Sequence, residues 1–186
     1  MRIVLLGPPG AGKGTQAVLL AEKRGIPHIS TGQMMRDAVS SGSDLGKKVK
    51  KFLDAGELVP DNLVIELIKE RLSRADCRTG FLLDGFPRTL EQAKSLTVLL
   101  KSLNKELTHV IEITVPESVI LERIKRRGET GSGRSDDNTE VASKRLQVYW
   151  AQTAPVSKYY QELGSLVEVN GLGTIEEVQS RIQGKI

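Results

Sequence analysis

The sequence predicts an α/β fold of three layers, in which helices cover both faces of a five-stranded parallel sheet. Short apolar runs rich in Val, Ile and Leu are typical of buried parallel strands. Helical patterns separate these runs, and strands that alternate with helices indicate a parallel sheet covered on both sides. The expected strands span residues 2–6, 28–29, 81–84, 109–115 and 165–169.

Helical spacing of apolar residues places the other elements between these strands. Thr174 and Glu177 fit a capping box at the start of the last helix. Pro155 predicts a kink near the middle of a long helix, because proline lacks the N–H that continues the hydrogen-bond pattern. The expected helices span residues 14–24, 33–41, 45–55, 62–74, 90–103, 117–127, 139–163 and 175–183.

Two segments exceed what a minimal strand-helix-strand pattern needs. Residues 30–59 contain helical material where a short connection would suffice, and residues 128–138 form a polar, glycine-containing loop. Excursions from a scaffold often carry function. We therefore expect a core that consists of residues 1–29, 60–127 and 139–186, with excursions from it at 30–59 and 128–138.

Composition limits the classes of protein to consider. A chain of 186 residues with 39% hydrophobic and 27% charged residues is ordinary for one globular domain with insertions. The net charge of +4 is consistent with a mildly basic surface or, more specifically, with positive charge gathered where an anion binds. Nucleic acid is a poor candidate for that anion, since aromatic residues for base stacking make up only 4% of the chain.

The cysteine and histidine content excludes other classes. Cys77 is the only cysteine, and His28 and His109 are the only histidines, so neither a disulfide nor a Cys/His zinc cluster can form. Cys77 is expected to be an inert thiol in a reducing compartment. Residues 1–7 are too short for a signal peptide, and no stretch approaches the roughly 20 apolar residues of a membrane span. We expect a cytoplasmic protein without a membrane partner.

A glycine-rich loop follows the first expected strand directly and opens a helix. It reads Gly7-Pro8-Pro9-Gly10-Ala11-Gly12-Lys13. Glycines let the backbone curl so that amide N–H groups converge on a phosphate, and the helix N-terminus adds partial positive charge. A turn that binds nothing is the alternative, but strand, glycines and lysine all lie in register for phosphate binding. The expected phosphate ligands are Gly10, Ala11, Gly12, Lys13, Gly14 and Thr15.

A second signal comes from residues 81–84, an apolar strand that ends in an acid. Asp84 at this place resembles the carboxylate that orients Mg²⁺ in phosphoryl-transfer proteins. The carboxylate could instead cap the next turn. Thr89 and Gln92 downstream could likewise form only a capping box.

Four motifs together resemble the adenylate kinase family. They run from residue 7 to beyond residue 170, so the resemblance covers essentially the whole chain. The matching stretches are residues 7–15, residues 81–88 with Gln92, residues 30–32 with Arg36, and Arg123, Arg127, residues 134–137 and Arg145.

The resemblance implies a P-loop fold that transfers a phosphoryl group between ATP and AMP, giving two ADP, and so maintains the balance of adenine nucleotides. Residues 30–59 would be the mononucleotide-binding insertion and 128–138 the short lid. ATP would bind on residues 10–15, with Arg127 and with Gly173 near the adenine. AMP would bind through Thr31, Arg36, Glu57, Leu58, Val59, Gly85, Phe86, Pro87, Arg88, Gln92, Arg134 and Arg145. The catalytic cations would be Lys13, Arg88, Arg123, Arg134 and Arg145.

The same resemblance implies that Mg²⁺ accompanies ATP, held by Asp84 through water, with no zinc and no nucleic-acid partner; we expect a monomer. The family usually has an acid after Ser-Thr-Gly, where this chain has Gln33. A neutral side chain there predicts weaker or differently shared positioning of the metal.

Chemistry supports a phosphate acceptor. The transition state spreads charge over the equatorial oxygens, which several guanidinium groups can grip two at a time. Arg123 and Arg127 share one helix face because they lie four residues apart. A lone arginine could be a solvated surface residue, but five or six at motif positions argue against that reading. We find no obvious general base, and a phosphate acceptor needs none, since it is mostly ionised at neutral pH.

Three other kinds of protein could contain some of these motifs. In UMP and CMP kinases of the same fold the position of Thr31 tends to be Ala and that of Gln92 Asn, so these two residues favour adenine. A GTPase switch needs Asn-Lys-x-Asp, but residues 104–107 read Asn-Lys-Glu-Leu. A non-enzymatic nucleotide or nucleic-acid binder would not require Lys13, Asp84 and Arg88 together.

Overall fold

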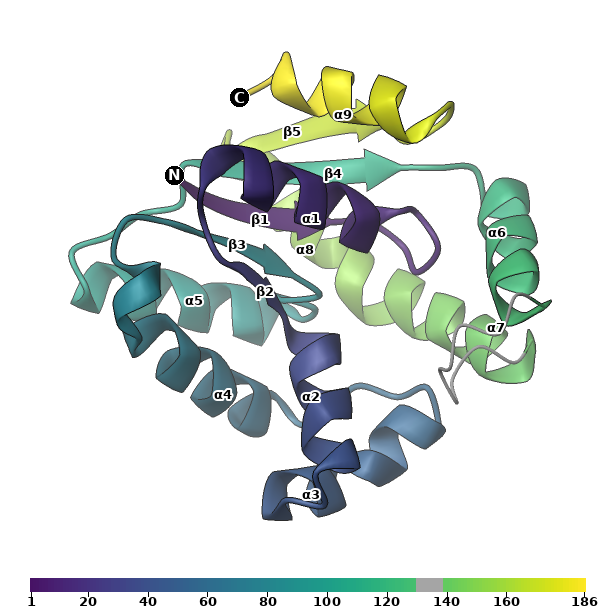
Figure 1. The fold of residues 1–186 in the computed structure, drawn as a ribbon, viewed down its shortest axis with the longest axis horizontal. Coiled ribbons are helices and arrows are strands. Elements are labelled where there is room, and N and C mark those ends of the chain that lie inside the picture. Colours follow the sequence, from purple (N-terminus) through teal and green to yellow (C-terminus); the bar gives the residue numbers. More distant parts are fainter. Residues whose placement is uncertain (130–138) are drawn as a thin grey trace.

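Five parallel strands form one sheet in the order β2-β3-β1-β4-β5 (Figure 1). The computed structural model describes the backbone of residues 1–129 and 139–186, and the side chains of residues 1–126 and 140–186. All five expected strands are present. They are β1 (Arg2–Leu6), β2 (His28–Ser30), β3 (Phe81–Asp84), β4 (His109–Thr114) and β5 (Leu166–Asn170).

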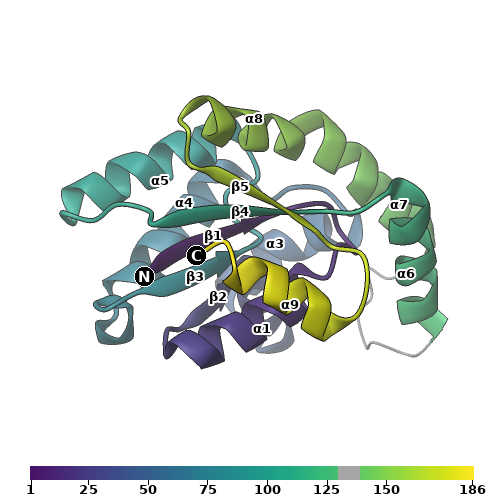
Figure 2. The same cartoon turned by 90° about the horizontal axis from the view of Figure 1, so that it is seen from above.

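Helices cover both faces of this sheet, which confirms the expected three layers (Figure 2). One face carries α1 (Lys13–Arg24) and α9 (Ile175–Gln183); the other carries α4 (Asp61–Ser73), α5 (Leu90–Ser102) and α8 (Ala154–Glu162).

The central strand β1 shows why both faces are apolar. Successive strand side chains point to opposite faces. Val4 and Leu6 accordingly pack in the core cluster with the residues of α4, α5 and α8. Ile3 and Leu5 pack in the other cluster, with residues of α1 and α9.

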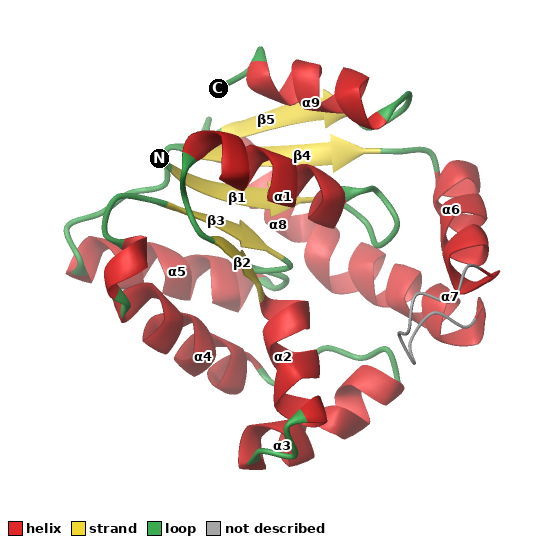
Figure 3. Ribbon diagram, viewed as in Figure 1, coloured by secondary structure: helices red, strands yellow, loops and turns green. Residues whose placement is uncertain are grey.

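The expected insertion contains two helices, α2 (Thr31–Ser40) and α3 (Asp44–Asp54), which lie beyond the end of β2 and away from the sheet (Figure 3). The first of them begins at Thr31, two residues earlier than predicted. The reason is a cap, because the side chain of Ser30 accepts a hydrogen bond from the N–H of Gln33.

Helices α6 (Glu117–Glu129) and α7 (Thr139–Val148) lie beyond the carboxyl ends of the strands. The single helix expected over 139–163 is interrupted. A π-helical turn, η2 (Tyr149–Thr153), separates α7 from α8, and the N–H of Ala154 bonds to the carbonyl of Tyr149. Pro155 then lies in the first turn of α8, where its missing N–H is tolerated. The predicted kink thus takes the form of a π turn just before the proline.

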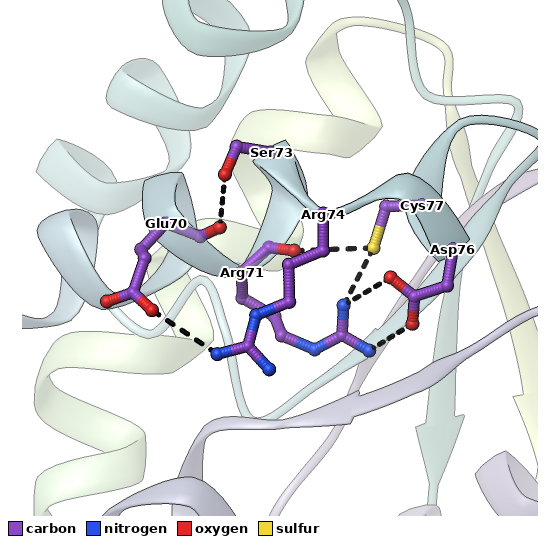
Figure 4. Close-up of polar contacts among 6 residues, drawn as sticks. All are labelled: Glu70, Arg71, Ser73, Arg74, Asp76 and Cys77. Carbon is purple, nitrogen blue, oxygen red and sulfur yellow. Dashed lines mark hydrogen bonds and ion pairs between the residues drawn. The ribbon is translucent and has the colours of Figure 1, made fainter.

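Polar side chains form hydrogen bonds at the carboxyl end of α4, where a 3₁₀ turn, η1 (Ala75–Cys77), leads to β3 (Figure 4). Two nitrogens of Arg71 donate to the carboxylate of Asp76, at 2.9 and 2.7 Å, and Arg71 Nη1 also lies 3.0 Å from the sulfur of Cys77. Cys77 is fully buried, and this burial raises the pKa of its thiol. A raised pKa leaves little thiolate, consistent with an inert thiol.

No helix within the described residues is long and apolar enough to cross a membrane.

Gly46 marks a close approach between α2 and α3. A Cβ atom on Gly46 would lie 2.1 Å from the carbonyl oxygen of Ala38. Gly46→Ala is therefore expected to lower the free energy of unfolding by about 1–3 kcal/mol, measured by urea denaturation. Gly184→Ala is the matched control, because a Cβ there has only ordinary contacts. Helix propensity alone predicts that alanine at position 46 stabilises the protein. A more stable Gly46→Ala variant would therefore contradict the inference that α2 and α3 leave no space for a side chain there.

Candidate active site

The candidate site lies at the carboxyl ends of the parallel strands, where ligands of open α/β sheets bind. β1 pairs with β3 on one side and β4 on the other, and Leu5 is in register with Asp84. The loop that follows β1 therefore begins directly beside the acid that ends β3.

The loop between β1 and α1 has the conformation that phosphate binding requires. Gly7, Gly10 and Gly12 have φ angles of 135°, 86° and 94°, which other residues rarely adopt. At Gly7 a side chain is also excluded by space, since a Cβ would lie 2.5 Å from the carbonyl oxygen of Ile113. Gly12 caps α1, so the N-terminus of that helix opens at the loop.

Two cationic side chains hold this loop. Lys13 Nζ donates to the carbonyl oxygens of Gly7, at 2.6 Å, and Pro8, at 2.9 Å. Arg123 reaches across from α6 and donates to Ala11 O at 3.3 Å and to Gly171 O at 3.0 Å. Lys13 thus lies over the loop, while Arg123 ties it to the segment after β5.

Asp84 provides the negative charge at the same edge. A Cβ on Gly14 would lie 3.7 Å from Asp84 Oδ2, so the carboxylate faces the loop. Its other neighbour is His28, whose Nε2 lies 3.5 Å from Oδ2. Burial raises the pKa of Asp84, but the contact with His28 and the positive charges of Lys13 and Arg88 outweigh burial and hold that pKa below its usual value. Asp84 is therefore ionised at neutral pH.

This carboxylate suits a magnesium ion that binds together with a phosphate ligand. Among the described residues, no group of three or more His, Cys, Asp or Glu side chains could hold a metal alone. Mg²⁺ needs fewer protein ligands, because phosphate oxygens and water complete its shell. One ionised acid beside a phosphate-binding loop meets that need.

A cleft opens between the loop, the insertion and α7. Four of the described side chains that line it are cationic, and they come from four different segments of the chain. They are Lys13, Arg36, Arg88 and Arg145. So many positive charges around one cleft suit a ligand with several phosphate charges.

A smaller pocket adjoins this cleft and shares Gly85 and Arg88 with it. Its wall is apolar apart from a few polar groups, as in pockets that bind small organic molecules. Thr31 Oγ1 donates to Gly85 O at 2.8 Å, so the hydroxyl keeps only its lone pairs for a ligand. The lining residues include Thr31, Met35, Leu58, Val59, Val64 and Gln92.

Arg88, which borders both spaces, is held at three points. Its Nε donates to Gly85 O at 2.8 Å, and its backbone N–H donates to Gln92 Oε1 at 2.7 Å. Its carbonyl accepts a 2.9 Å bond from Thr153 Oγ1, in the π turn before α8. Thr153 was not predicted, because no local pattern links it to a residue 65 positions earlier. His28 was also missed as a neighbour of Asp84.

Most of the predicted AMP residues line the two spaces, with one exception among the described side chains. Glu57, Leu58, Val59, Gly85 and Pro87 take part in one or both walls. Phe86 instead packs in the core, 1% exposed, and lines neither space.

Three further residues predicted for nucleotide binding do not appear among the described residues that line the two spaces: Gly173, Arg127 and Arg134. Gly173, with a φ of 102°, lies beside Glu177, the partner of Thr174 in the capping box that starts α9 as predicted. The predicted lid over residues 128–138 lies almost entirely outside the residues that the structure describes, and so does Arg134. The side chain of Arg127 is also outside the described part.

Gln33 has a role that the sequence did not indicate. Its Oε1 accepts a 2.9 Å bond from Arg36 Nη2, and its Nε2 donates to Asp37 Oδ1 at 2.7 Å. Gln33 therefore bridges an arginine of the cleft to an acid on the exposed side of α2.

Comparison with known proteins agrees with this geometry. The sequence profile of the family described as adenylate kinase matches residues 5–165. An adenylate kinase of Leptospira biflexa serovar Patoc is 49% identical over 181 residues, covering 97% of each chain. An adenylate kinase of Brucella ovis is 48% identical over 188 residues, covering 98% of this chain and 97% of the relative. With a glycine-rich loop after β1, an acid-tipped strand and a cationic cleft in one fold, and with this similarity along nearly its whole length, the chain belongs to the adenylate kinase family.

Proposed function

We propose that this phosphotransferase binds ATP on the loop between β1 and α1, binds AMP in the pocket of Thr31 and Gln92, and transfers the terminal phosphoryl group to give two ADP. One observation carries the proposal: the phosphate loop and the smaller pocket open onto one cleft that Lys13, Arg36, Arg88 and Arg145 line. Two phosphate tails can meet there, with cations on both sides.

On the donor side, amides of residues 10–15 and the N-terminus of α1 would hold the ATP phosphates. Lys13 would leave its two carbonyl contacts for the transferring group, since phosphate oxygens are stronger acceptors for an ammonium group. Asp84 would hold Mg²⁺ through water, and the metal would neutralise charge on the outer phosphates.

On the acceptor side, the pocket offers hydrogen-bond acceptors where an adenine amino group would lie. The hydroxyl of Thr31 donates its hydrogen bond to Gly85 O, so toward a ligand it can only accept. Arg88 and Arg36 would hold the AMP phosphate. That phosphate is mostly ionised at neutral pH, so it can attack without a general base.

Water competes with AMP as acceptor, and closure would exclude it. We propose that residues 30–59, which contain α2 and α3, are the mononucleotide-binding insertion, and that residues 128–138 are the lid, with the remaining residues as the core. Closure of an adenylate kinase lid is a known example of this behaviour. The cytoplasmic location and the monomeric state stay predictions.

The acceptor preference is tested with four nucleoside monophosphates. In a coupled assay at saturating MgATP, kcat/KM for AMP is expected to exceed the values for GMP, UMP and CMP by on the order of 10²-fold or more, because a pocket built around hydrogen bonds rejects bases that leave its polar groups unpaired. A preference for UMP or CMP would instead support the rival kinase of the same fold.

Arg88→Ala tests the catalytic cleft. Loss of a cation that acts on the transferring group is expected to lower kcat by about 10²- to 10⁴-fold, with an unchanged circular dichroism spectrum. Arg78→Ala removes an exposed arginine that precedes the amino end of β3, and it serves as the control. Normal turnover by Arg88→Ala would remove this residue from the catalytic group.

Gln33→Asp tests the position where the family usually has an acid. An added negative charge near the cleft is expected to lower the Mg²⁺ concentration at half-maximal activity by about threefold, because ligand charge tunes affinity for divalent cations. Gln161→Asp adds the same charge to the exposed face of α8 as a control. Identical magnesium titrations for Gln33→Asp and the parent chain would show that the metal does not use this position.

A further inference from the structure

We infer that Asp61 determines the preference for adenine over guanine, by fixing which way round the side-chain amide of Gln92 faces. Asp61 acts through Gln92 and is thus a positioning residue. The inference rests on the proposed function, in which the AMP base lies against Gln92.

Asp61 is the first residue of α4, and it contacts the start of α5 with both carboxylate oxygens. Its Oδ1 accepts a 2.7 Å hydrogen bond from Gln92 Nε2, and its Oδ2 accepts a 2.8 Å bond from Thr89 Oγ1. Thr89 caps α5 by accepting the N–H of Gln92 at 3.1 Å. A carboxylate can only accept, so it demands the nitrogen end of the Gln92 amide.

The other end of the same amide meets the opposite demand. Gln92 Oε1 accepts a 2.7 Å hydrogen bond from the backbone N–H of Arg88, a group that can only donate. A turned amide would place its NH₂ against the N–H of Arg88 and its oxygen against the carboxylate of Asp61. Gln92 is 2% exposed, so water cannot relieve those two repulsions.

Fixing the amide leaves a defined set of hydrogen-bonding groups for a ligand. Asp61 and Arg88 use one N–H and one lone pair of Gln92, and one N–H and one lone pair remain. Gln92 lines the smaller pocket together with Thr31, whose hydroxyl can only accept. The orientation of the donor and acceptor that Gln92 presents there is therefore set by groups outside the pocket.

Adenine and guanine present opposite patterns on the edge that pairs with other bases. Adenine offers an amino donor beside a ring-nitrogen acceptor, whereas guanine offers a carbonyl acceptor beside an N–H donor. A glutamine that can turn its amide over can match either base, because its last torsion is roughly two-fold. A fixed amide matches only one of them, and so Asp61 converts Gln92 into a selective reader.

The experiment measures kcat and KM for AMP and for GMP at saturating MgATP, together with calorimetric affinities for both nucleotides. Asp61→Ala is expected to lower the AMP-to-GMP ratio of kcat/KM about tenfold, through the two monophosphate KM values, with the KM for ATP unchanged. The effect is limited because the N–H of Arg88, a backbone group, still favours one orientation. Asp61→Asn, which keeps the shape of the side chain and serves if the alanine variant is unstable, is expected to give a loss of similar size, since an amide can pair with either end of Gln92 and therefore no longer selects one orientation.

A double variant tests whether Asp61 acts through the amide. In a Gln92→Ala background, adding Asp61→Ala is expected to leave the AMP-to-GMP ratio unchanged. A purely structural tie between α4 and α5 would change stability in both backgrounds and the ratio in neither. Asp44→Ala removes the equivalent first residue of α3, whose contact with Lys47 is exposed, and should leave the ratio at the parent value.

The outcomes separate this inference from the proposed function. If Gln92→Ala leaves the KM for AMP unchanged, the proposed placement of AMP fails and the inference fails with it. If Gln92→Ala raises that KM while Asp61→Ala and Asp61→Asn keep the parent AMP-to-GMP ratio, only the inference is overturned. A ratio that Asp61→Ala changes equally with and without Gln92 would also overturn it.

Discussion

The pairing of β1 between β3 and β4 is the constraint on which the rest of the site depends. Parallel strands in register bring their carboxyl ends to one edge, and here that edge joins the phosphate loop to Asp84. The loop is pressed so closely against β4 that only glycine fits at position 7, where a Cβ would lie 2.5 Å from Ile113 O. The amides of the loop and the carboxylate are therefore placed by the sheet, before any ligand contributes.

Around this edge, the functional side chains are held mostly by backbone carbonyls. Lys13, Arg88 and Arg123 all donate to main-chain oxygens of the loops that border the site. Such contacts orient cations without neutralising them, since a carbonyl carries no net charge. Asp84 is the exception, because it lies among positive groups that lower its pKa. The arrangement keeps net positive charge in the cleft, which favours a ligand with several phosphates.

The proposed recognition of the base follows a different logic, in which Thr31 and Gln92 in the smaller pocket each have part of their hydrogen-bonding capacity already used. The hydroxyl of Thr31 donates a hydrogen bond to Gly85 O. The amide of Gln92 accepts one from the N–H of Arg88 and donates one to Asp61. What remains is a fixed pattern. Selectivity of this kind comes from groups that a wrong base would leave unpaired, more than from the shape of the pocket.

Local sequence determined the helices and strands of this protein and the conformation of the glycine-rich loop after β1. The apolar runs, the glycines before Lys13, the acid at the end of residues 81–84 and the capping box at Thr174 all act within a few residues, so their patterns are visible in one dimension. Only the tertiary structure decided which distant residues hold the side chains and backbone of the candidate site in position. Thr153 holds Arg88, and Asp61 holds Gln92 from 31 positions away. Such contacts arise where separate helices pack, so no spacing along the chain predicts them. An acid in the first turn of a helix interacts favourably with the helix dipole whichever way its side chain points, so the position of Asp61 did not reveal its contact with Gln92.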